Sequence, residues 1–516
     1  MNLLTLLIAL PAVGFVLTLL IPRAQEQAIR LFTLAVSLLT FVLSLGLATG
    51  YQSGQTGQQF VADMVWIANP EIHWHVGIDG LSLWLIILST FLTPIAILIS
   101  WRYIGDRVKE FFAFLLLLEF GLVGVFSAWD LFLFYVFWEV ALVPMYFLIG
   151  IWGHDRRIYA AVKFFLYTMA GSVLMLAAII FLYLRAGTFD YAVILDGFSS
   201  GRISLTHTEE TLLFLAFFVA FAIKVPLFPL HTWLPDAHVE APSAGSLMLA
   251  SVMLKMGTYG IVRFCLPMFP TAARENAGWI VILAIIGIIY GALVAMVQPN
   301  MKKLVAYSSV SHLGFVVLGI FSFTQLGLDG AVYQMLNHGI STGALFILVG
   351  FLYERRHSLA ISDYGGVATV APWISAMFLI TTLASIGLPT LNNFIGEFLI
   401  LQGSAQAHFT WTIFAALGVI LSACYMLWMY QRVFFGETHD EVRHHISDFN
   451  MREWACVIPL VIMMVWMGMY TQTFLPPVSE ANSKILDQSK MNVPLRVALP
   501  SHGLSAQSSG GSLHAR

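Results

Sequence analysis

The sequence predicts an all-α polytopic membrane protein with about fourteen transmembrane helices. Of its 516 residues, 59% are hydrophobic and only 10% are charged, whereas soluble domains carry roughly 25% charged residues. Apolar runs of about 20 residues, the length that crosses a hydrocarbon core, recur between residues 3 and 470 with short polar breaks. These runs leave no stretch for a separate soluble domain.

The first apolar run, residues 3–21, is expected to be a retained helix. It lacks the basic segment that precedes the core of a signal peptide, and another apolar span follows at once. The expected spans begin near Leu3, Ala28, Leu81, Phe111, Leu131, Ile158, Leu212, Ser243, Trp279, Leu304, Ala331, Trp373, Phe409 and Trp454.

The basic residues predict the orientation of the helices. The loops on one side hold Arg23, Arg30, Arg102, Arg107, Lys109, Arg156, Arg157, Lys302, Lys303, Arg355, Arg356, Arg432, Arg443 and Arg452. The loops on the other side hold only Arg185, Arg202, Arg263 and Arg274. The positive-inside rule places the first side in the cytoplasm, and an even number of spans then places both termini in the periplasm. The basic residues form no continuous stripe, so no nucleic-acid partner is expected.

Six charged residues fall inside expected spans: Lys163, Lys224, Lys255, Glu119, Glu139 and Glu397. A charge at bilayer depth costs about 2.5–3.5 kcal/mol, so several together imply interior partners and usually an ion pathway. Structural ion pairs remain the alternative. Lys163 lies close to Arg157 and can also extend to the cytoplasmic surface, and Glu119 has no partner recognisable from the sequence.

Two histidines are expected at mid-span in neighbouring helices. His312 and His338 can pass protons at physiological pH, although a lone buried histidine is more often only hydrogen-bonded. Nearby hydroxyl groups favour a relay role; they belong to Ser308, Ser309, Ser311 and Ser341.

A buried lysine beside a carboxylate can act as a proton switch. Burial favours the neutral amine, whereas a nearby carboxylate favours the ammonium. We therefore expect Lys224 to keep its proton when Glu139 approaches and to release it when they separate. Lys255 is the expected acceptor.

Two expected spans contain breaks next to a buried charge. Residues 222–238, AIKVPLFPLHTWLPDAH, place Pro226 and Pro229 after Lys224, and residues 386–399, IGLPTLNNFIGEFL, place Pro389 before Glu397. Proline removes backbone hydrogen bonds, and the freed carbonyls need water or side chains. Paired broken helices are typical of transport sites, although a packing kink would have the same pattern.

No metal site is expected. Asp236, His238 and Glu240 lie in LPDAHVEAPSAG, which is expected to form a polar cytoplasmic turn, and the three cysteines have no ligand spacing. The chain after Phe474 is expected to be a polar tail without helical periodicity, disordered in its last stretch around the Ser/Gly cluster at residues 508–512.

Four long motifs carry a resemblance to a known family. They are FYVFWEVALVPMYFLIGIWG (residues 134–153), FAIKVPLFPLHTWLPDAHVEAPSAGS (221–246), MLKMGTYGIVRF (253–264) and KKLVAYSSVSHLGFV (302–316). With these motifs, residues 77–435 closely resemble the antiporter-like subunits of bacterial respiratory complex I. The FWE-x-x-LVPMYF segment and the short chain are most similar to the middle, M-type subunit.

The resemblance implies two inverted five-helix repeats, which the sequence pattern alone does not reveal. They would follow three N-terminal helices in residues 1–105, occupy residues 106–266 and 275–436, and precede a loop and helix in 437–474 and a tail in 475–516. The relay positions of the family fall on Glu139, Lys224, Lys255, His312, His338 and Glu397. A glutamate at position 397 matches the M type, because the L type and related cation antiporters carry lysine there.

The resemblance also implies how the chain works with its partners. NADH, FMN, iron–sulfur clusters and quinone would be bound by other subunits, and this chain would bind no cofactor and export protons. Neighbouring antiporter-like subunits would lie on either side of it in a bacterial inner membrane. A subunit of a sodium/proton antiporter, or an anchor subunit of a hydrogenase or formate-linked complex, remains the alternative.

Overall fold

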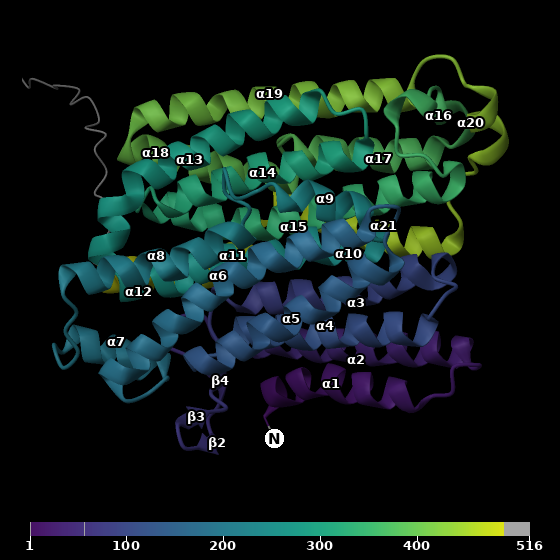
Figure 1. The fold of residues 1–516 in the computed structure, drawn as a ribbon. Coiled ribbons are helices and arrows are strands. Elements are labelled where there is room, and N and C mark those ends of the chain that lie inside the picture. Colours follow the sequence, from purple (N-terminus) through teal and green to yellow (C-terminus); the bar gives the residue numbers. More distant parts are fainter. Residues whose placement is uncertain (1, 56, 490–516) are drawn as a thin grey trace, which may run out of the picture.

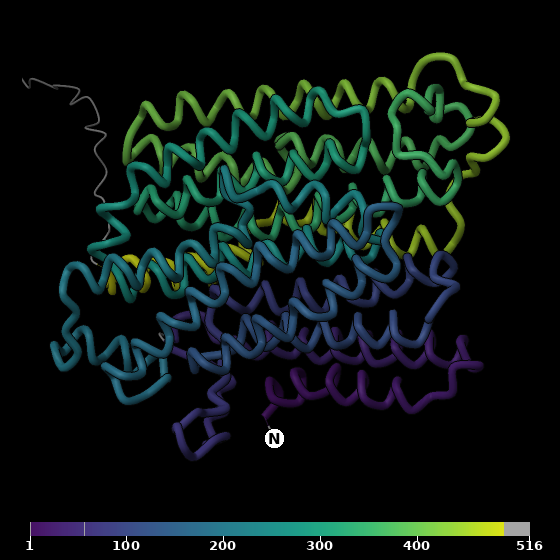
Figure 2. The backbone as a smooth tube through the Cα atoms, viewed as in Figure 1, coloured from purple at the N-terminus to yellow at the C-terminus, as the bar shows by residue number. Residues whose placement is uncertain are grey.

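A computed structural model describes residues 2–55 and 57–489 and confirms a predominantly helical fold. The long helices run roughly side by side, and loops connect them at the two ends of the bundle (Figure 1). The continuous backbone path shows that the chain begins at one edge of the bundle, that α19 lies at the opposite edge, and that the last part of the chain returns to the middle (Figure 2).

The first half of the chain begins with long helices and ends in shorter pieces. The helices are α1 (Leu3–Leu20), α2 (Glu26–Gly50), α3 (Leu83–Tyr103), α4 (Val108–Ser127), α5 (Leu131–Trp152), α6 (Arg157–Ala186), α7 (Tyr191–Ser199), α8 (His207–Lys224), α9 (Trp233–Glu240), α10 (Ser243–Met248), η1 (Leu249–Met253), α11 (Leu254–Gly260), η2 (Ile261–Cys265) and α12 (Leu266–Met268). Here η1 and η2 are π-helical turns within one continuous helix from α10 to α12.

The second half repeats the alternation of long and short helices. It contains α13 (Pro270–Met296), α14 (Met301–Ile320), α15 (Gln325–Arg356), η3 (Ile361–Asp363), α16 (Val367–Val370), α17 (Pro372–Ser385), α18 (Asn392–Ala407), α19 (Phe409–Phe434), α20 (Asp440–His445), α21 (Met451–Met469), η4 (Thr471–Thr473) and α22 (Leu475–Gln488).

Twelve helices among the described residues are long and apolar enough to cross a membrane. The other two expected spans coincide with the interrupted pairs α8/α9 and α17/α18. The total of fourteen spans stays a prediction, because the pieces of each pair are too short or too charged to qualify alone.

Local sequence signals explain several helix starts. Asp130 accepts hydrogen bonds from two backbone N–H groups at the start of α5, and Thr206 and Glu209 form a reciprocal capping box at the start of α8. The side chains of Asn300 and Thr324 each accept a hydrogen bond from one backbone N–H at the starts of α14 and α15. Each cap satisfies backbone donors that the first helical turn leaves free.

Hydrogen bonds from residues at or near helix ends to backbone carbonyls outside the helices lie at the two ends of the bundle. At one end, Trp152 donates to the carbonyl of Asp106, and Lys302 donates to the carbonyl of Ala241. Because this end carries most of the basic loops, we call it the basic end. At the opposite end, Trp129 donates to the carbonyl of Gly77.

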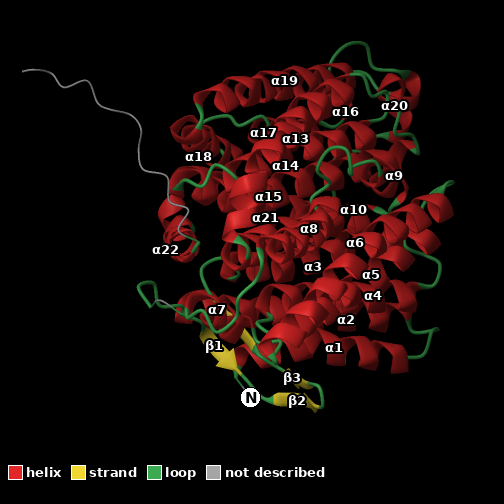
Figure 3. Ribbon diagram, turned by 60° about the vertical axis from the view of Figure 1, so that its left-hand side comes forward, coloured by secondary structure: helices red, strands yellow, loops and turns green. Residues whose placement is uncertain are grey.

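Four short strands lie between α2 and α3 within this predominantly helical fold: β1 (Gln59–Ala62) pairs with β4 (Val76–Ile78), and β2 (Val65–Ala68) pairs with β3 (Glu71–His73). Figure 3 shows them in yellow at one edge of the molecule. One expectation about secondary structure was wrong: the chain after Phe474 continues as α22 rather than as an aperiodic tail. The Ser/Gly cluster at residues 508–512 lies outside the described residues.

Two placements of polar residues were also wrong. The segment with Asp236, His238 and Glu240 is not a polar turn but the helix α9, in which His238 is fully buried. Arg263, expected in a loop, lies in η2 and is 4% exposed. In both cases the polar side chain has a position inside the protein, so the local polarity was misread as solvent exposure.

Candidate functional site

The lysine of the continuous helix α10–α12 is held at a widened turn. The π-helical turn η1 directly precedes Lys255, whose ammonium donates to the carbonyl of Ala250 at 2.5 Å. A π turn leaves carbonyls without their usual helical donors. The same ammonium donates to Nδ1 of His338 at 2.7 Å, which links this helix to α15.

The second histidine pairs with the glutamate of the second broken helix. His312 Nδ1 lies 2.7 Å from Glu397 Oε1, and both side chains are almost completely buried. Gln334 donates to the same carboxylate at 3.1 Å, and Tyr425 lies 3.4 Å from the other ring nitrogen of His312. Sequence reasoning missed Gln334 and Tyr425, although Gln334 is one turn before His338 on the same helix.

The two histidines bring both pairs together. The ring centroids of His312 and His338 are 5.9 Å apart. The structure therefore assembles four of the predicted residues, Lys255, His338, His312 and Glu397, into one buried cluster, which we call the central cluster. Its members come from four helices, of which α14 and α15 are consecutive while α11 and α18 lie before and after them in the sequence.

Glu139 and Lys224 lie outside the central cluster, and neither a hydrogen bond nor an ion pair joins these two described residues. The Lys224 ammonium lies 5.4 Å from the ring centroids of both Trp138 and Phe164. Aromatic faces attract a cation. Lys224 is thus held among aromatic rings and, within the described residues, has no hydrogen bond or ion pair with Glu139.

At both helix breaks, a side chain donates a hydrogen bond to a backbone carbonyl near the end of the first helix of the pair. The Trp233 indole donates to the carbonyl of Ile223, next to Lys224, at 2.9 Å. At the second break, Asn393 donates to the carbonyl of Ser385 at 3.4 Å. The stretches between the helices contain the predicted prolines, which are Pro226, Pro229 and Pro389.

The two remaining predicted residues lie elsewhere. Glu119 is fully buried on α4, and neither carboxylate oxygen has a hydrogen-bond partner among the described residues. Lys163 forms an ion pair with Asp236 at 2.7 Å and is 19% exposed. Lys163 therefore belongs to the basic end rather than to the central cluster.

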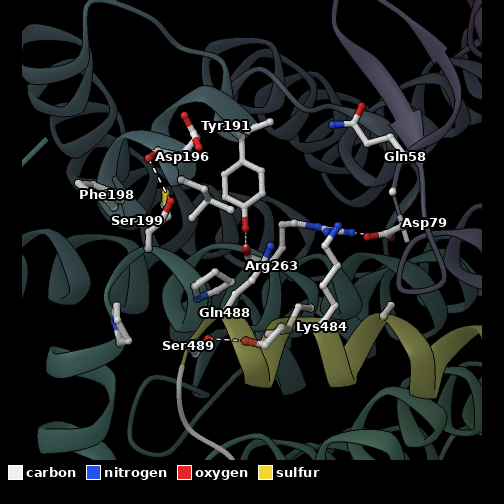
Figure 4. Close-up of a pocket in the computed structure, with 18 of the residues that line it drawn as sticks. Gln58, Asp79, Tyr191, Asp196, Phe198, Ser199, Arg263, Lys484, Gln488 and Ser489 are labelled. Atoms are coloured by element: carbon white, nitrogen blue, oxygen red, sulfur yellow. Dashed lines mark hydrogen bonds and ion pairs between the residues drawn. The ribbon is translucent and has the colours of Figure 1, made fainter. Parts of the chain in front are cut away.

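A large cavity lies at the end opposite the basic end. Its volume is about 1210 Å³, and its lining includes Tyr51, Asp79, Tyr191, Arg263 and Lys484. Figure 4 shows the Arg263 guanidinium pointing to Asp79 and the Tyr191 hydroxyl pointing to the Arg263 backbone, with distances of 2.6 Å and 2.5 Å. Burial raises the pKa of the Asp79 carboxyl, but the Arg263 charge and hydrogen bond outweigh it and hold that pKa below its usual value.

Metal ligands do not gather in the part of the chain that the structure describes. No group of three or more histidine, cysteine, aspartate or glutamate side chains there could hold a metal ion. The three cysteines are free and well separated in sequence. The imidazole, amine and carboxyl groups of the central cluster can exchange protons with one another.

Comparison with known proteins is consistent with this chemistry. Residues 128–423 match the family model described as NADH:quinone oxidoreductase/Mrp antiporter, TM. The chain is 46% identical to the NADH-quinone oxidoreductase subunit M of Rhodobacter capsulatus, over 91% of this chain and 93% of that one. It is 42% identical to the NADH-ubiquinone oxidoreductase chain 4 of Marchantia polymorpha, over 94% and 97%.

Solved structures share the fold. A chain of respiratory complex I from Thermus thermophilus with bound NADH superposes with a TM-score of 0.84 at 34% identity, covering 94% of this chain and 99% of that one. A chain of an archaeal membrane-bound sulfane sulfur reductase reaches a TM-score of 0.82 at 22% identity, covering 95% and 99%, which shows the fold alone. The chain therefore belongs to the NADH:quinone oxidoreductase/Mrp antiporter family of membrane subunits, among the relatives named subunit M or chain 4.

Proposed function

We propose that this chain is the proton-translocating membrane subunit of an NADH:quinone oxidoreductase, complex I, with the central cluster as the middle of its relay. The observation that carries the proposal is the pair of 2.7 Å contacts, Lys255 with His338 and His312 with Glu397, joined by rings 5.9 Å apart. Groups that exchange protons at physiological pH here lie one after another through the protein interior.

The relay begins with Glu139 and Lys224. When Glu139 approaches Lys224, the ammonium form is favoured; when the two separate, the buried lysine releases its proton toward Lys255. The proton then passes through His338 and His312 to Glu397, which serves the exit side. Moving one charge against 100 mV requires about 2.3 kcal/mol, which is within the range of changing one partly buried ion pair.

The redox chemistry belongs to other subunits. NADH oxidation and quinone reduction, with FMN and iron–sulfur clusters, would occur in those partners, and this chain would respond by moving protons. Neighbouring antiporter-like subunits would flank it on either side. The basic loops favour an inner membrane of a bacterium, with the basic end in the cytoplasm and both termini in the periplasm.

A sodium/proton antiporter subunit is less well supported. Both relatives described above are named as subunits of NADH-quinone or NADH-ubiquinone oxidoreductases. Position 397 also carries glutamate, hydrogen-bonded within the central cluster, rather than lysine. These two observations favour the redox-driven role.

The test is NADH-driven proton uptake into inside-out membrane vesicles that contain the complete complex. Lys224→Ala and Glu139→Gln should lower the number of protons taken up per NADH oxidised, with sodium/proton exchange unchanged. Exposed Arg202, whose described polar contacts are with the nearby residues Asp196 and Ser200, provides the control variant Arg202→Gln. Normal NADH-driven pumping with lost sodium exchange would instead identify an antiporter subunit.

A further inference from the structure

Helix α9 separates a cavity at the basic end from the central cluster. Asp236 and Glu240, four residues apart and hence on one face of α9, both line a cavity of about 320 Å³ together with Arg156 and Lys303. His238 lies between them in sequence and therefore points away from the cavity. Its ring stacks on Phe346 of α15 with centroids 4.4 Å apart and is fully buried.

A row of unsatisfied polar atoms runs from α9 to the central cluster. Phe346, Thr342 and His338 follow one another at four-residue intervals on α15, so they share a face with about 6 Å between neighbours. Both ring nitrogens of His238, the hydroxyl of Thr342 and Nε2 of His338 are buried with no hydrogen-bond partner among the described residues. Buried polar atoms in proteins are normally bonded, and ordered water supplies the partner where protein does not.

The contacts of α9 hold His238 in this position. Lys302 donates to the carbonyl of Ala241 at the end of α9, at 2.5 Å. The backbone N–H of Arg156 donates to the Glu240 carboxylate at 2.9 Å, and the Ser246 hydroxyl donates to the His238 carbonyl at 3.1 Å. All three contacts leave the imidazole nitrogens free, so packing alone does not account for a histidine here.

We propose that His238 and Thr342, with water between them, carry protons from the cavity at Glu240 to His338 and thereby supply the central cluster. This inference rests on the proposed function, because it gives the same relay a further uptake route, which joins the Glu139–Lys224–Lys255 path at His338. The neutral His238 ring accepts a proton at one nitrogen and releases the proton on its other nitrogen. The Thr342 hydroxyl receives one proton as it donates another, so neither residue changes its charge over a cycle.

The experiment uses the complete complex in inside-out vesicles. His238→Phe keeps an aromatic ring against Phe346 but removes both nitrogens, and Thr342→Val keeps the shape but removes the hydroxyl. The matched control is Thr5→Val on α1, where the hydroxyl is also buried without a partner in the described part of the chain. Protons taken up per NADH oxidised are compared with those of Lys255→Ala.

We expect His238→Phe and Thr342→Val to lose as much proton uptake per NADH as Lys255→Ala, whereas Thr5→Val keeps the unmodified value. Thr342→Ser, which retains a hydroxyl, should recover part of the uptake that Thr342→Val loses. His238→Ala should lose uptake and regain it when imidazole is added on the cytoplasmic side, an effect that a packing role does not produce. If the His238→Phe complex fails to assemble, the protons taken up per NADH by His238→Gln and Thr342→Val test the proposal instead.

The experiment distinguishes a failure of this inference from a failure of the proposed function. Normal uptake in His238→Phe and Thr342→Val, with uptake lost in Lys255→Ala, would overturn this inference and leave the proposed function intact. Normal uptake in Lys255→Ala itself would overturn the proposed function. A low ratio in His238→Ala that imidazole does not raise would reduce His238 to a packing residue.

Discussion

The ammonium of Lys255 lies 2.7 Å from Nδ1 of His338, and both side chains are fully buried. The contact joins α11 to α15, which belong to different halves of the chain. The lysine has the carbonyl of Ala250 as its other partner. A buried cation with two acceptors can lose one of them without being left unsolvated, so the His338 contact is suited to being made and broken.

Replacing His338 should separate its structural role from its relay role. In His338→Gln the side-chain oxygen can still accept from Lys255, so the fold should persist while proton uptake per NADH falls. In His338→Leu the lysine loses one of its two acceptors in the interior and keeps the carbonyl of Ala250, which should also lower stability by about 1–3 kcal/mol. Proton uptake and thermal unfolding of the purified complex measure the two effects. Normal uptake in His338→Gln would exclude this imidazole from the relay.

Glu397 should be needed for its charge rather than for its hydrogen bonds. Glu397→Gln preserves partners for His312 and Gln334 but cannot take up a proton, and we expect proton transfer through the cluster to slow by about 100-fold or more. Glu397→Asp, one methylene shorter, should retain part of the rate. The measurement is the initial rate of NADH-driven proton uptake in vesicles, normalised to the amount of assembled complex. Equal rates for the Gln and Asp variants would contradict the prediction.

The Asp79–Arg263 ion pair should stabilise the end opposite the basic end. Asp79→Asn leaves the buried guanidinium without its counter-charge, which should cost about 3–5 kcal/mol. The double variant Asp79→Asn with Arg263→Gln should lose less, because no unpaired charge remains. Thermal unfolding in detergent compares them. A double variant less stable than the single one would show that the residues act independently of their charges.

Much of the central cluster could be predicted from the sequence. Lys255, His312, His338 and Glu397 are conspicuous because charged and titratable groups are costly in apolar spans. Their contacts could not be predicted, since helices that touch here are far apart in the chain. Nor does the composition of residues 249–253 indicate the π turn that places Lys255 against Ala250. The same limit hid Arg263, because its partner Asp79 is 184 residues away.

The sequence of α22 shows why its helix was missed. Its buried residues Val478, Asn482, Ile485 and Leu486 do follow a helical period, but one of them is polar. Asn482 faces inward because it donates to the buried carboxylate of Asp329 at 2.9 Å. An inward-facing amide is read as solvent-exposed until its partner is known.

Close packing of α15 against α18 should be sensitive to one methyl group. A Cβ at Gly330 would lie 2.7 Å from the backbone nitrogen of Ile400 and 2.9 Å from the carbonyl oxygen of Gly396. Gly330→Ala should therefore destabilise the protein by about 1–3 kcal/mol. Gly278→Ala on α13 is the control, because a Cβ there would meet nothing within 4 Å and alanine favours a helix. Equal unfolding temperatures for the two variants would refute the close contact.

His154 in the loop between α5 and α6 should make stability depend on pH. Burial, with a further contribution from the Lys302 charge, lowers the pKa of His154 from 6.5 to about 4. The unfolded chain therefore binds a proton at this site between about pH 6.5 and 4 that the folded chain does not. Stability decreases as the pH is lowered wherever the unfolded state binds more protons than the folded state. The contribution of neutral His154 to stability is therefore complete above pH 6.5 and is lost progressively as the pH falls to 4.

His154→Phe, which preserves a ring against Tyr353, should remove this part of the acid sensitivity. The unfolding temperature of the variant should then decrease less than that of the unmodified protein as the pH is lowered in detergent from above the pKa of His154 in the unfolded chain, 6.5, toward that in the folded chain, about 4. His444→Gln, at an exposed histidine of α20, is the control and should leave the pH dependence unchanged. A His154→Phe curve parallel to that of the unmodified protein would mean that His154 titrates alike in the folded and unfolded states.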